Sequence, residues 1–183
     1  MATVAQKLIT AEEFLQMPEP PDGSNQELVR GEVITMPPPG GLHGACCSKT
    51  DYRLQHYAEV NQRGVVTANA GIITERDPDS VRGPDVAYWS RERLPEVPVG
   101  YIETPPDLAV EVLSPGTRMR QLRNKIREYF NRGVRMVWVL DPEDRTVTVY
   151  RTPDEGRVLH ESATLSGDDV LPGFSCRVAE LFV

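Results

Sequence analysis

The sequence predicts an α/β fold with a central mixed β-sheet flanked by helices, in one domain over residues 1–183. Strand-like apolar runs alternate with helical patterns, and 183 residues suit a single hydrophobic core. An apolar run at 108–113 is followed by a helical pattern and then by a second apolar run at 134–140. A strand, a helix and a strand in this order predict one parallel pair inside an otherwise antiparallel sheet.

The amino-terminal third predicts a short helix, a hairpin and a longer helix. Thr10 is followed three residues later by Glu13, which is the capping-box pattern of a helix start. Two β-rich runs within residues 27–36, "ELVRGEVITM", surround Arg-Gly and predict a hairpin. The loop "MPPPGGL" follows, and a helix is expected from about 43 to 62, with Gly64 as its stop.

The remaining elements are expected to complete the sheet. The pattern at 116–133 is the strongest helix signal, because its apolar residues recur at helical spacing and Gly133 ends it. Residues 65–75 predict two short strands or one bent strand, and residues 76–84 predict a loop. Further strands are expected in "DVAYW", in the apolar run at 108–113, in "VRMVWVL", in "TVTVYR" and, at an edge, in "RVLHES".

The composition limits the cellular setting. No apolar run approaches the ~20 residues that span a bilayer, and the first residues turn acidic before an apolar signal core develops, so we expect a cytoplasmic protein without an export signal. Cys46, Cys47 and Cys176 have no CxxC spacing and are expected to be reduced packing residues.

The charge distribution points in two directions. The formal net charge of −7 does not indicate nucleic-acid binding by the molecule as a whole. Between Arg118 and Arg127, however, the chain has five cations and no acid. Taken alone, this stretch is more typical of a solvated helix surface than of a phosphate-binding face.

Glu111 stands out, because it lies in the middle of an apolar strand. A buried carboxylate without a partner is very costly, so it must be neutral, paired or bound to a cation. On its own a salt bridge to a nearby arginine would explain it. Asp85 starts another apolar strand, where an acid also serves as a turn cap. Two such strands can bring the carboxylates together, and a divalent cation between them relieves their repulsion.

Lys125 supplies a cation within reach of this pair. It flanks the apolar stripe of the helix at 116–133, about 12 Å along the helix by its rise per residue. Glu111 lies about 7 Å inside the end of its strand. Since helical side chains lean toward the amino-terminal end, an extended Lys125 can reach Glu111.

Several segments resemble the Uma-two family of restriction endonucleases, within the PD-(D/E)xK nuclease superfamily. They are "ELVRGEV", "GPDVAYWSRERLP", "PPDLAVEVLSPGTR", "NKIREYFNRGVRMVWVLDPEDRTVTVYR" and "LPGFSCRVAELF". The resemblance implies a restriction-endonuclease-like fold, with Asp85, Glu111 and the backbone carbonyl of Val112 holding a metal ion. It also implies that Glu27 and His43 belong to the site.

The resemblance also shows two departures from the wider pattern. The superfamily usually has a lysine two residues after the second acid, where this chain has Leu113. Lys125 matches the helical position at which this family has its lysine instead. Many members have an Asp four residues earlier, where this chain has Gln121, so one contact to the metal or the lysine is expected to be missing.

The function implied is hydrolysis of phosphodiester bonds in nucleic acid, expected to be DNA, with Mg²⁺ or Mn²⁺ as the metal. Lys125 would orient the attacking water and His43 would assist proton transfer, while Arg118, Arg120 and Arg123 would contact phosphates. Nuclease-like folds often pair, and the acidic surface leaves room for a homodimer. One alternative is a non-catalytic nucleic-acid-binding or interaction protein on the same fold, and another is a hydrolase of a small phosphoester.

Overall fold

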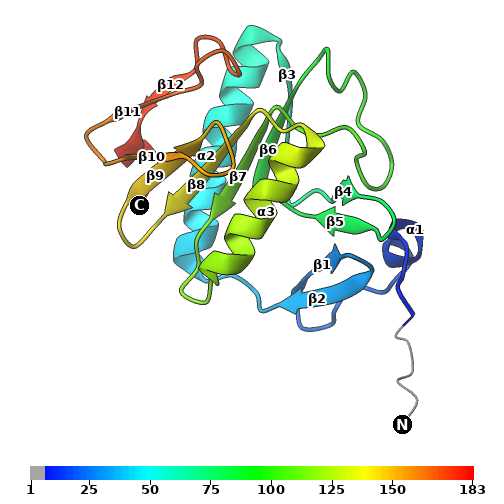
Figure 1. Cartoon of the computed structure of the whole chain (residues 1–183). Coiled ribbons are helices and arrows are strands. Elements are labelled where there is room, and N and C mark those ends of the chain that lie inside the picture. The colour runs from blue at the N-terminus through cyan, green and yellow to red at the C-terminus, as the bar shows by residue number, and fades with distance from the viewer. Residues whose placement is uncertain (1–6) are drawn as a thin grey trace.

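A six-stranded sheet forms the centre of the computed structural model, which describes residues 7–183 (Figure 1). Its strands β7 and β8 pair in parallel, and the other neighbouring strands pair antiparallel. The predicted mixed sheet with one parallel pair is therefore confirmed. In spatial order the strands are β10 (Gly156–Leu159), β9 (Thr146–Tyr150), β8 (Met136–Asp141), β7 (Leu108–Val112), β6 (Val86–Ser90) and β3 (Gly64–Ala68).

Helix α3 (Met119–Arg132) makes the crossover between the two parallel strands and covers one face of this sheet (Figure 1). Its apolar stripe, which includes Leu122 and Ile126, packs on Ala109 and Val137 of the sheet. Gly133 ends the helix in the left-handed conformation that glycine adopts without strain. The helix predicted for residues 116–133 is therefore confirmed, with its first turn starting three residues later.

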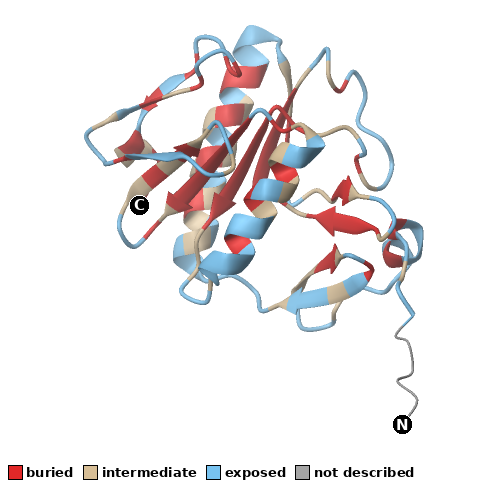
Figure 2. Ribbon diagram, in the orientation of Figure 1, coloured by how far each residue is buried: buried red, intermediate tan, exposed pale blue. Residues whose placement is uncertain are grey.

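Helix α2 (Gly41–Asn61) covers the opposite face, together with elements near the carboxyl end. Leu54 of α2 and Trp138 of β8 belong to this larger core cluster. Figure 2 shows the buried central strands between the two helices. The elements that complete the cluster were not predicted, because they are short, and they are β11 (Thr164–Ser166), β12 (Ser175–Arg177) and the 3₁₀ helix η1 (Val178–Leu181).

The end of α2 differs from the prediction. Gln62, with φ at 51°, caps the helix in the left-handed region, and the chain continues directly into β3. Gly64 is thus a strand residue rather than the helix stop. A Cβ atom at Gly64 would lie 2.0 Å from the carbonyl oxygen of Trp89. The glycine is therefore needed for close packing of β3 on β6.

A second, four-stranded antiparallel sheet lies beside the first (Figure 1). The antiparallel pair β1–β2 confirms the hairpin predicted at 27–36. For residues 65–75, the two-strand alternative is confirmed, because β3 and β4 lie in different sheets. The loop predicted for 76–84 is wrong in part, because residues 80–82 form a short buried strand. In spatial order the strands are β2 (Glu32–Met36), β1 (Asn25–Val29), β5 (Ser80–Arg82) and β4 (Ile72–Glu75).

Helix α1 (Ala11–Leu15) closes this second sheet. The hydroxyl of Thr10 accepts a hydrogen bond from the backbone N–H of Glu13, and the Glu13 carboxylate accepts one from the N–H of Thr10, so the predicted capping box is present. Phe14 packs against Leu28 and Val81. Within residues 7–183, no helix has the length and apolar character needed to cross a membrane. The expected lack of an export signal rests partly on residues 1–6, which lie outside the described part.

Candidate active site

A cleft of about 1230 Å³ opens between the β1–β2 hairpin and the first turns of α3. The carboxyl end of β7, the start of β6 and the first turn of α2 also contribute to its walls. The structure brings the predicted catalytic and metal-binding residues together here, although they come from five different elements or their flanks. The cleft is lined by Glu27, His43, Asp85, Glu111, Val112 and Lys125.

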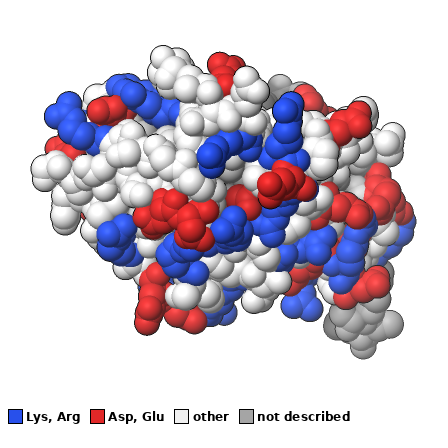
Figure 3. All heavy atoms as spheres, turned by 90° about the horizontal axis from the view of Figure 1, so that it is seen from above, with Lys and Arg blue, Asp and Glu red and all other residues white. Residues whose placement is uncertain are grey.

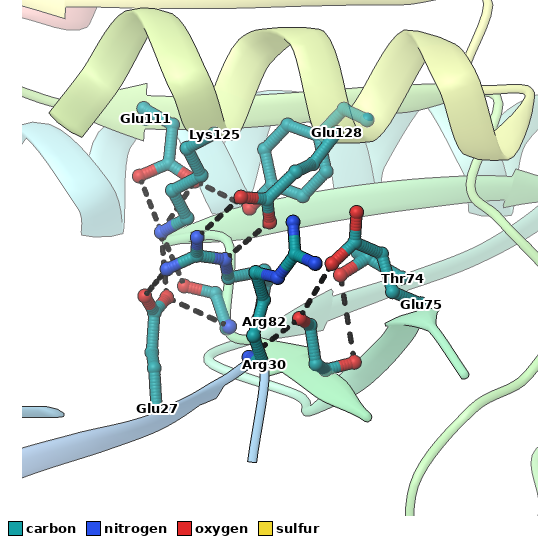
Figure 4. A network of polar contacts seen from close by, with 11 residues as sticks. Glu27, Arg30, Thr74, Glu75, Arg82, Glu111, Lys125 and Glu128 are labelled. Atoms are coloured by element: carbon teal, nitrogen blue, oxygen red, sulfur yellow. Dashed lines mark hydrogen bonds and ion pairs between the residues drawn. The ribbon is translucent and has the colours of Figure 1, made fainter. Parts of the chain in front are cut away.

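Lys125 lies between Glu111 and Glu27 (Figure 4). Its ammonium donates a hydrogen bond to the Glu111 carboxylate at 2.9 Å, so the contact expected from helix geometry is present. The same nitrogen is 2.8 Å from Oε1 of Glu27 and 3.3 Å from the carbonyl oxygen of Gly83. The neighbouring carboxylates raise the pKa of Lys125 despite its burial, so this lysine stays charged.

Glu111 is 8% exposed, and its charge is only partly compensated. The Tyr129 hydroxyl donates a hydrogen bond of 2.6 Å to its Oε1, and Lys125 is the cation beside it, rather than one of the arginines after Ser114. Burial raises the pKa of Glu111 to about 7; Lys125 lowers it, whereas Asp85 and Glu27 raise it further. In the absence of a bound cation, the anionic form of Glu111 is therefore unfavourable at neutral pH.

Glu27 is held as an anion by two cations from different elements. Arg82 of β5 donates to its Oε2 at 2.9 Å, and the N–H of Gly83 donates to its Oε1 at 3.1 Å. Burial alone would raise the pKa of Glu27, but Lys125 and Arg82 lower it below its usual value. Two nitrogens of Arg82 also donate to Glu128 on α3, both at 2.6 Å. Figure 4 shows this chain of ion pairs from β1 to α3.

Sequence reasoning missed the pairing of Arg82 with Glu128. Two signals were available: Arg82 immediately precedes "GPD", and Glu128 lies three residues after Lys125, on the same side of the helix. The pair joins the second sheet to α3 and thereby fixes both Glu27 and Lys125.

Asp85 is anchored to the neighbouring strand. Its Oδ2 accepts a hydrogen bond of 2.7 Å from the backbone N–H of Val112, and its Oδ1 lies 3.3 Å from Nε2 of His43. The hydrogen bond to Asp85 raises the pKa of His43 in spite of burial, and Glu111 and the Val112 backbone add to this effect. His43 therefore lies directly against the acids of the site.

Cys47 packs against the main core, as predicted for all three cysteines, but its thiol also contacts the site. Cys46 and Cys176 lie in the main core, but the half-buried Cys47 has its Sγ 3.4 Å from Nδ1 of His43. Burial, together with Asp85, Cys46 and Glu111, strongly raises the pKa of the Cys47 thiol. The thiol is thus protonated near neutral pH, which does not suit a nucleophile.

The site suits a hard divalent cation in its donor chemistry and its charge. Asp85, Glu111 and the backbone of Val112 present oxygen atoms at the meeting point of β6 and β7, and oxygen is the ligand type that Mg²⁺ prefers. Four acids and two permanent cations gather at this site, and with all four acids ionised their formal charges sum to −2. The acids are Glu27, Asp85, Glu111 and Glu128, and the cations are Arg82 and Lys125. His43, whose pKa is raised, lies against one of these acids, Asp85.

The predicted phosphate-contacting arginines differ in position. Arg118, the N-cap of α3, lines the cleft. Arg120 and Arg123 are exposed, and at about 100° per residue they lie on the side of α3 away from Lys125. Gln121 lines the cleft one turn before Lys125. On the face shown in Figure 3, basic and acidic side chains are interspersed rather than gathered into one basic patch.

A central mixed sheet with a smaller sheet beside it, and a cleft that holds Glu111 of β7, Asp85 at the start of β6 and Lys125 of α3, define a nuclease-like α/β protein. The chain belongs to the Uma2 family, described as "putative restriction endonuclease", whose sequence model matches residues 11–179. It is also similar to a solved structure from Anabaena variabilis, described as a "putative nuclease belonging to DUF820". That likeness has a TM-score of 0.81 at 25% identity, over 95% of this chain and 97% of the other. No curated protein matches the chain.

Proposed function

We propose that this protein is an endonuclease that hydrolyses phosphodiester bonds in DNA with Mg²⁺, or alternatively Mn²⁺, as its metal. Its family and its nuclease-like fold support a nuclease. The observation that carries the proposal is the position of Lys125, held against the buried Glu111 at the floor of an open cleft with Asp85 beside them. A cytoplasmic location and a homodimer that cuts both strands stay predictions from the sequence.

Asp85, Glu111 and the main-chain carbonyl of Val112 would hold the metal ion. When bound, such an ion supplies a Lewis acid and lowers the pKa of a coordinated water. The hydrogen bond from the N–H of Val112 to Oδ2 fixes the orientation of the Asp85 carboxylate against β7. The side chain therefore need not be immobilised when its other oxygen, Oδ1, binds a ligand. The hydroxyl of Tyr129 does the same for Glu111. The protein thus prearranges both carboxylates before any ligand arrives.

Lys125 and His43 would perform the remaining chemistry. The Lys125 ammonium has three donors in a partly buried cleft, where a fixed positive charge stabilises developing negative charge far better than in water. It would orient the attacking water and then offset the charge on the phosphoryl oxygens. His43, beside Asp85, would assist the transfer of the proton of that water, since an imidazole exchanges protons near neutral pH.

Titration with Mg²⁺ or Mn²⁺ is expected to raise the melting temperature of the wild type but not that of Asp85→Ala. At 100 times the dissociation constant, mass action gives about 2.7 kcal/mol, which corresponds to roughly 5–10 °C for a chain of this length. Differential scanning fluorimetry measures this without a substrate. Asp154→Ala is the matched control, because Asp154 is an exposed acid that pairs with Arg127. An unchanged wild type would instead support the non-catalytic nucleic-acid-binding alternative.

Arg118→Ala is expected to weaken DNA binding and to reduce its salt dependence. Loss of one phosphate contact should lower the slope of log K against log salt by about 0.9. Fluorescence anisotropy with a labelled duplex, in Ca²⁺ to prevent cleavage, measures the slope. The control is Arg123→Ala, which removes the same charge from the outer side of α3 and should leave the slope unchanged. Equal effects of the two variants would show a general charge effect rather than contact in the cleft.

A further inference from the structure

A cluster at the amino-terminal end of α2 contains three chemically different metal ligands. His43 and Cys47 are four residues apart on the same side of α2, and Asp85 approaches them from the start of β6. One ligand atom from each of the three residues lies within 4.8 Å of the other two. Nε2 of His43 is 3.3 Å from Oδ1 of Asp85, and Sγ of Cys47 is 3.4 Å from Nδ1 of His43.

This donor set differs from the oxygen set beside it. A thiolate and an imidazole are poor ligands for Mg²⁺, whereas sulfur and nitrogen favour Zn²⁺. For such ligands, affinity rises from Mn²⁺ toward the later first-row metals. We propose that His43, Cys47 and Asp85 form a Zn²⁺-binding site, distinct from the oxygen-donor site but sharing Asp85 with it.

The geometry needs only side-chain adjustment. With metal–ligand bonds of about 2.0–2.3 Å, the ligands of a tetrahedral zinc ion lie about 3.5 Å apart. Since all the ligand atoms lie within 4.8 Å of one another, no pair has to approach by more than about 1 Å. Rotation of two side chains on one helix face supplies this while α2 stays in place. His43 and Asp85 are 11% and 16% exposed and line the cleft, so the ion enters there and its fourth position faces the cleft.

The charges also balance. Without metal, the thiol of Cys47 is neutral, because burial and the nearby acids disfavour a thiolate. A bound zinc ion reverses this preference, since a coordinating thiol is deprotonated, and the proton passes to the solvent. One thiolate and one carboxylate then neutralise the two positive charges of the ion. Such a neutral centre suits a half-buried position better than an uncompensated cation does.

Binding in this site has a consequence for the oxygen-donor site. An ion bound to Oδ1 of Asp85 would make this shared carboxylate unavailable to the oxygen-donor site. Zn²⁺ should therefore weaken the binding of Mg²⁺, and this part of the inference rests on the proposed function. The zinc site itself does not, because it includes neither Glu111 nor Lys125.

Cobalt(II) titration of the full-length protein tests the site without nucleic acid. The wild type is expected to bind one equivalent of Co²⁺ with a near-ultraviolet thiolate-to-cobalt absorption band, and Zn²⁺ should bleach this band. Cys47→Ser should lose the band. Cys176→Ser is the control and should keep it, because Cys176 lies on β12 among the core residues of the opposite end of the chain.

A wild type without the band, or a band that survives in Cys47→Ser, would overturn the zinc site. If Cys47→Ser does not fold, the rate of cysteine alkylation in the wild type tests the site instead. Zn²⁺ should slow the modification of Cys47 and leave that of Cys46 and Cys176 unchanged. Equal rates for Cys47 with and without Zn²⁺ would refute the site. Glu111→Gln separates the two proposals, since it should keep the cobalt band and lose the Mg²⁺-dependent rise in melting temperature. A wild type with the band but without that rise would refute only the proposed function.

Discussion

Lys125→Met is expected to lower the rate of DNA cleavage by about 10²- to 10³-fold, the usual cost of removing one preorganised electrostatic group. Methionine keeps most of the side-chain volume but removes the positive charge and the N–H donors. In the wild type these donors face Glu111 and Glu27 inside the cleft. Single-turnover cleavage of plasmid DNA with saturating Mg²⁺ measures the effect on the chemical step. A rate within tenfold of the wild type would contradict the role given to Lys125.

Loss of this lysine should also destabilise the fold, because two buried carboxylates then lack their shared cation. Breaking a buried ion pair typically costs about 3–5 kcal/mol. The double variant Glu27→Gln/Lys125→Met removes one charge of each sign and should recover most of that loss in urea unfolding. It should stay inactive. Recovery of both stability and cleavage would mean that Lys125 only supports the structure.

The fold was most predictable where periodic patterns are long. The stripe that includes Leu122 and Ile126 fixed the face of α3, and the apolar runs on either side of it fixed the parallel pair β7–β8. Strand β5 had no such signal, since it has three residues within a segment rich in Asp, Pro and Gly. Its pairing of Val81 with Leu28 joins residues more than fifty positions apart. Only tertiary packing makes that short segment a strand.

The site was predictable where a residue conflicts with its surroundings. Glu111 is such a residue, because a carboxylate in an apolar strand requires a partner, and helix rise placed Lys125 within reach of it. Tyr129 gave no comparable signal: its ring fits the apolar stripe, and the pattern says nothing of the hydroxyl that contacts Glu111. Cys47 was missed for the same reason. A pattern gives the face on which a side chain lies, but a contact depends on what packs against that face.

Glu111→Gln is expected to stabilise the metal-free protein at pH 8 by about 3 kcal/mol, since each pKa unit corresponds to 1.36 kcal/mol. The folded protein holds the pKa of Glu111 at about 7, above its usual value of 4.5, because burial and nearby acids disfavour the anion. The wild type therefore loses stability as the pH rises from about 4.5 to about 7. Glutamine mimics the protonated form, so the two proteins should be equally stable near pH 4.5. Urea unfolding in EDTA at several pH values measures the difference.

Glu27→Gln is the matched control, and its expected effect has the opposite sign. Lys125 and Arg82 lower the pKa of Glu27, so its anion stabilises the fold above pH 4.5 and that contribution is lost on acidification. The variant should be less stable than the wild type at pH 8. His43 is present in all three proteins, and its raised pKa stabilises the fold at low pH, a contribution that is lost as the pH rises above 6.5. Because Glu111 supplies part of that shift, the two glutamates are compared at pH 8, on the alkaline side of this loss. If both variants were destabilised at pH 8, Glu111 would be a stabilising ion-pair partner rather than a strained carboxylate. A divalent cation would then have no unfavourable charge to relieve.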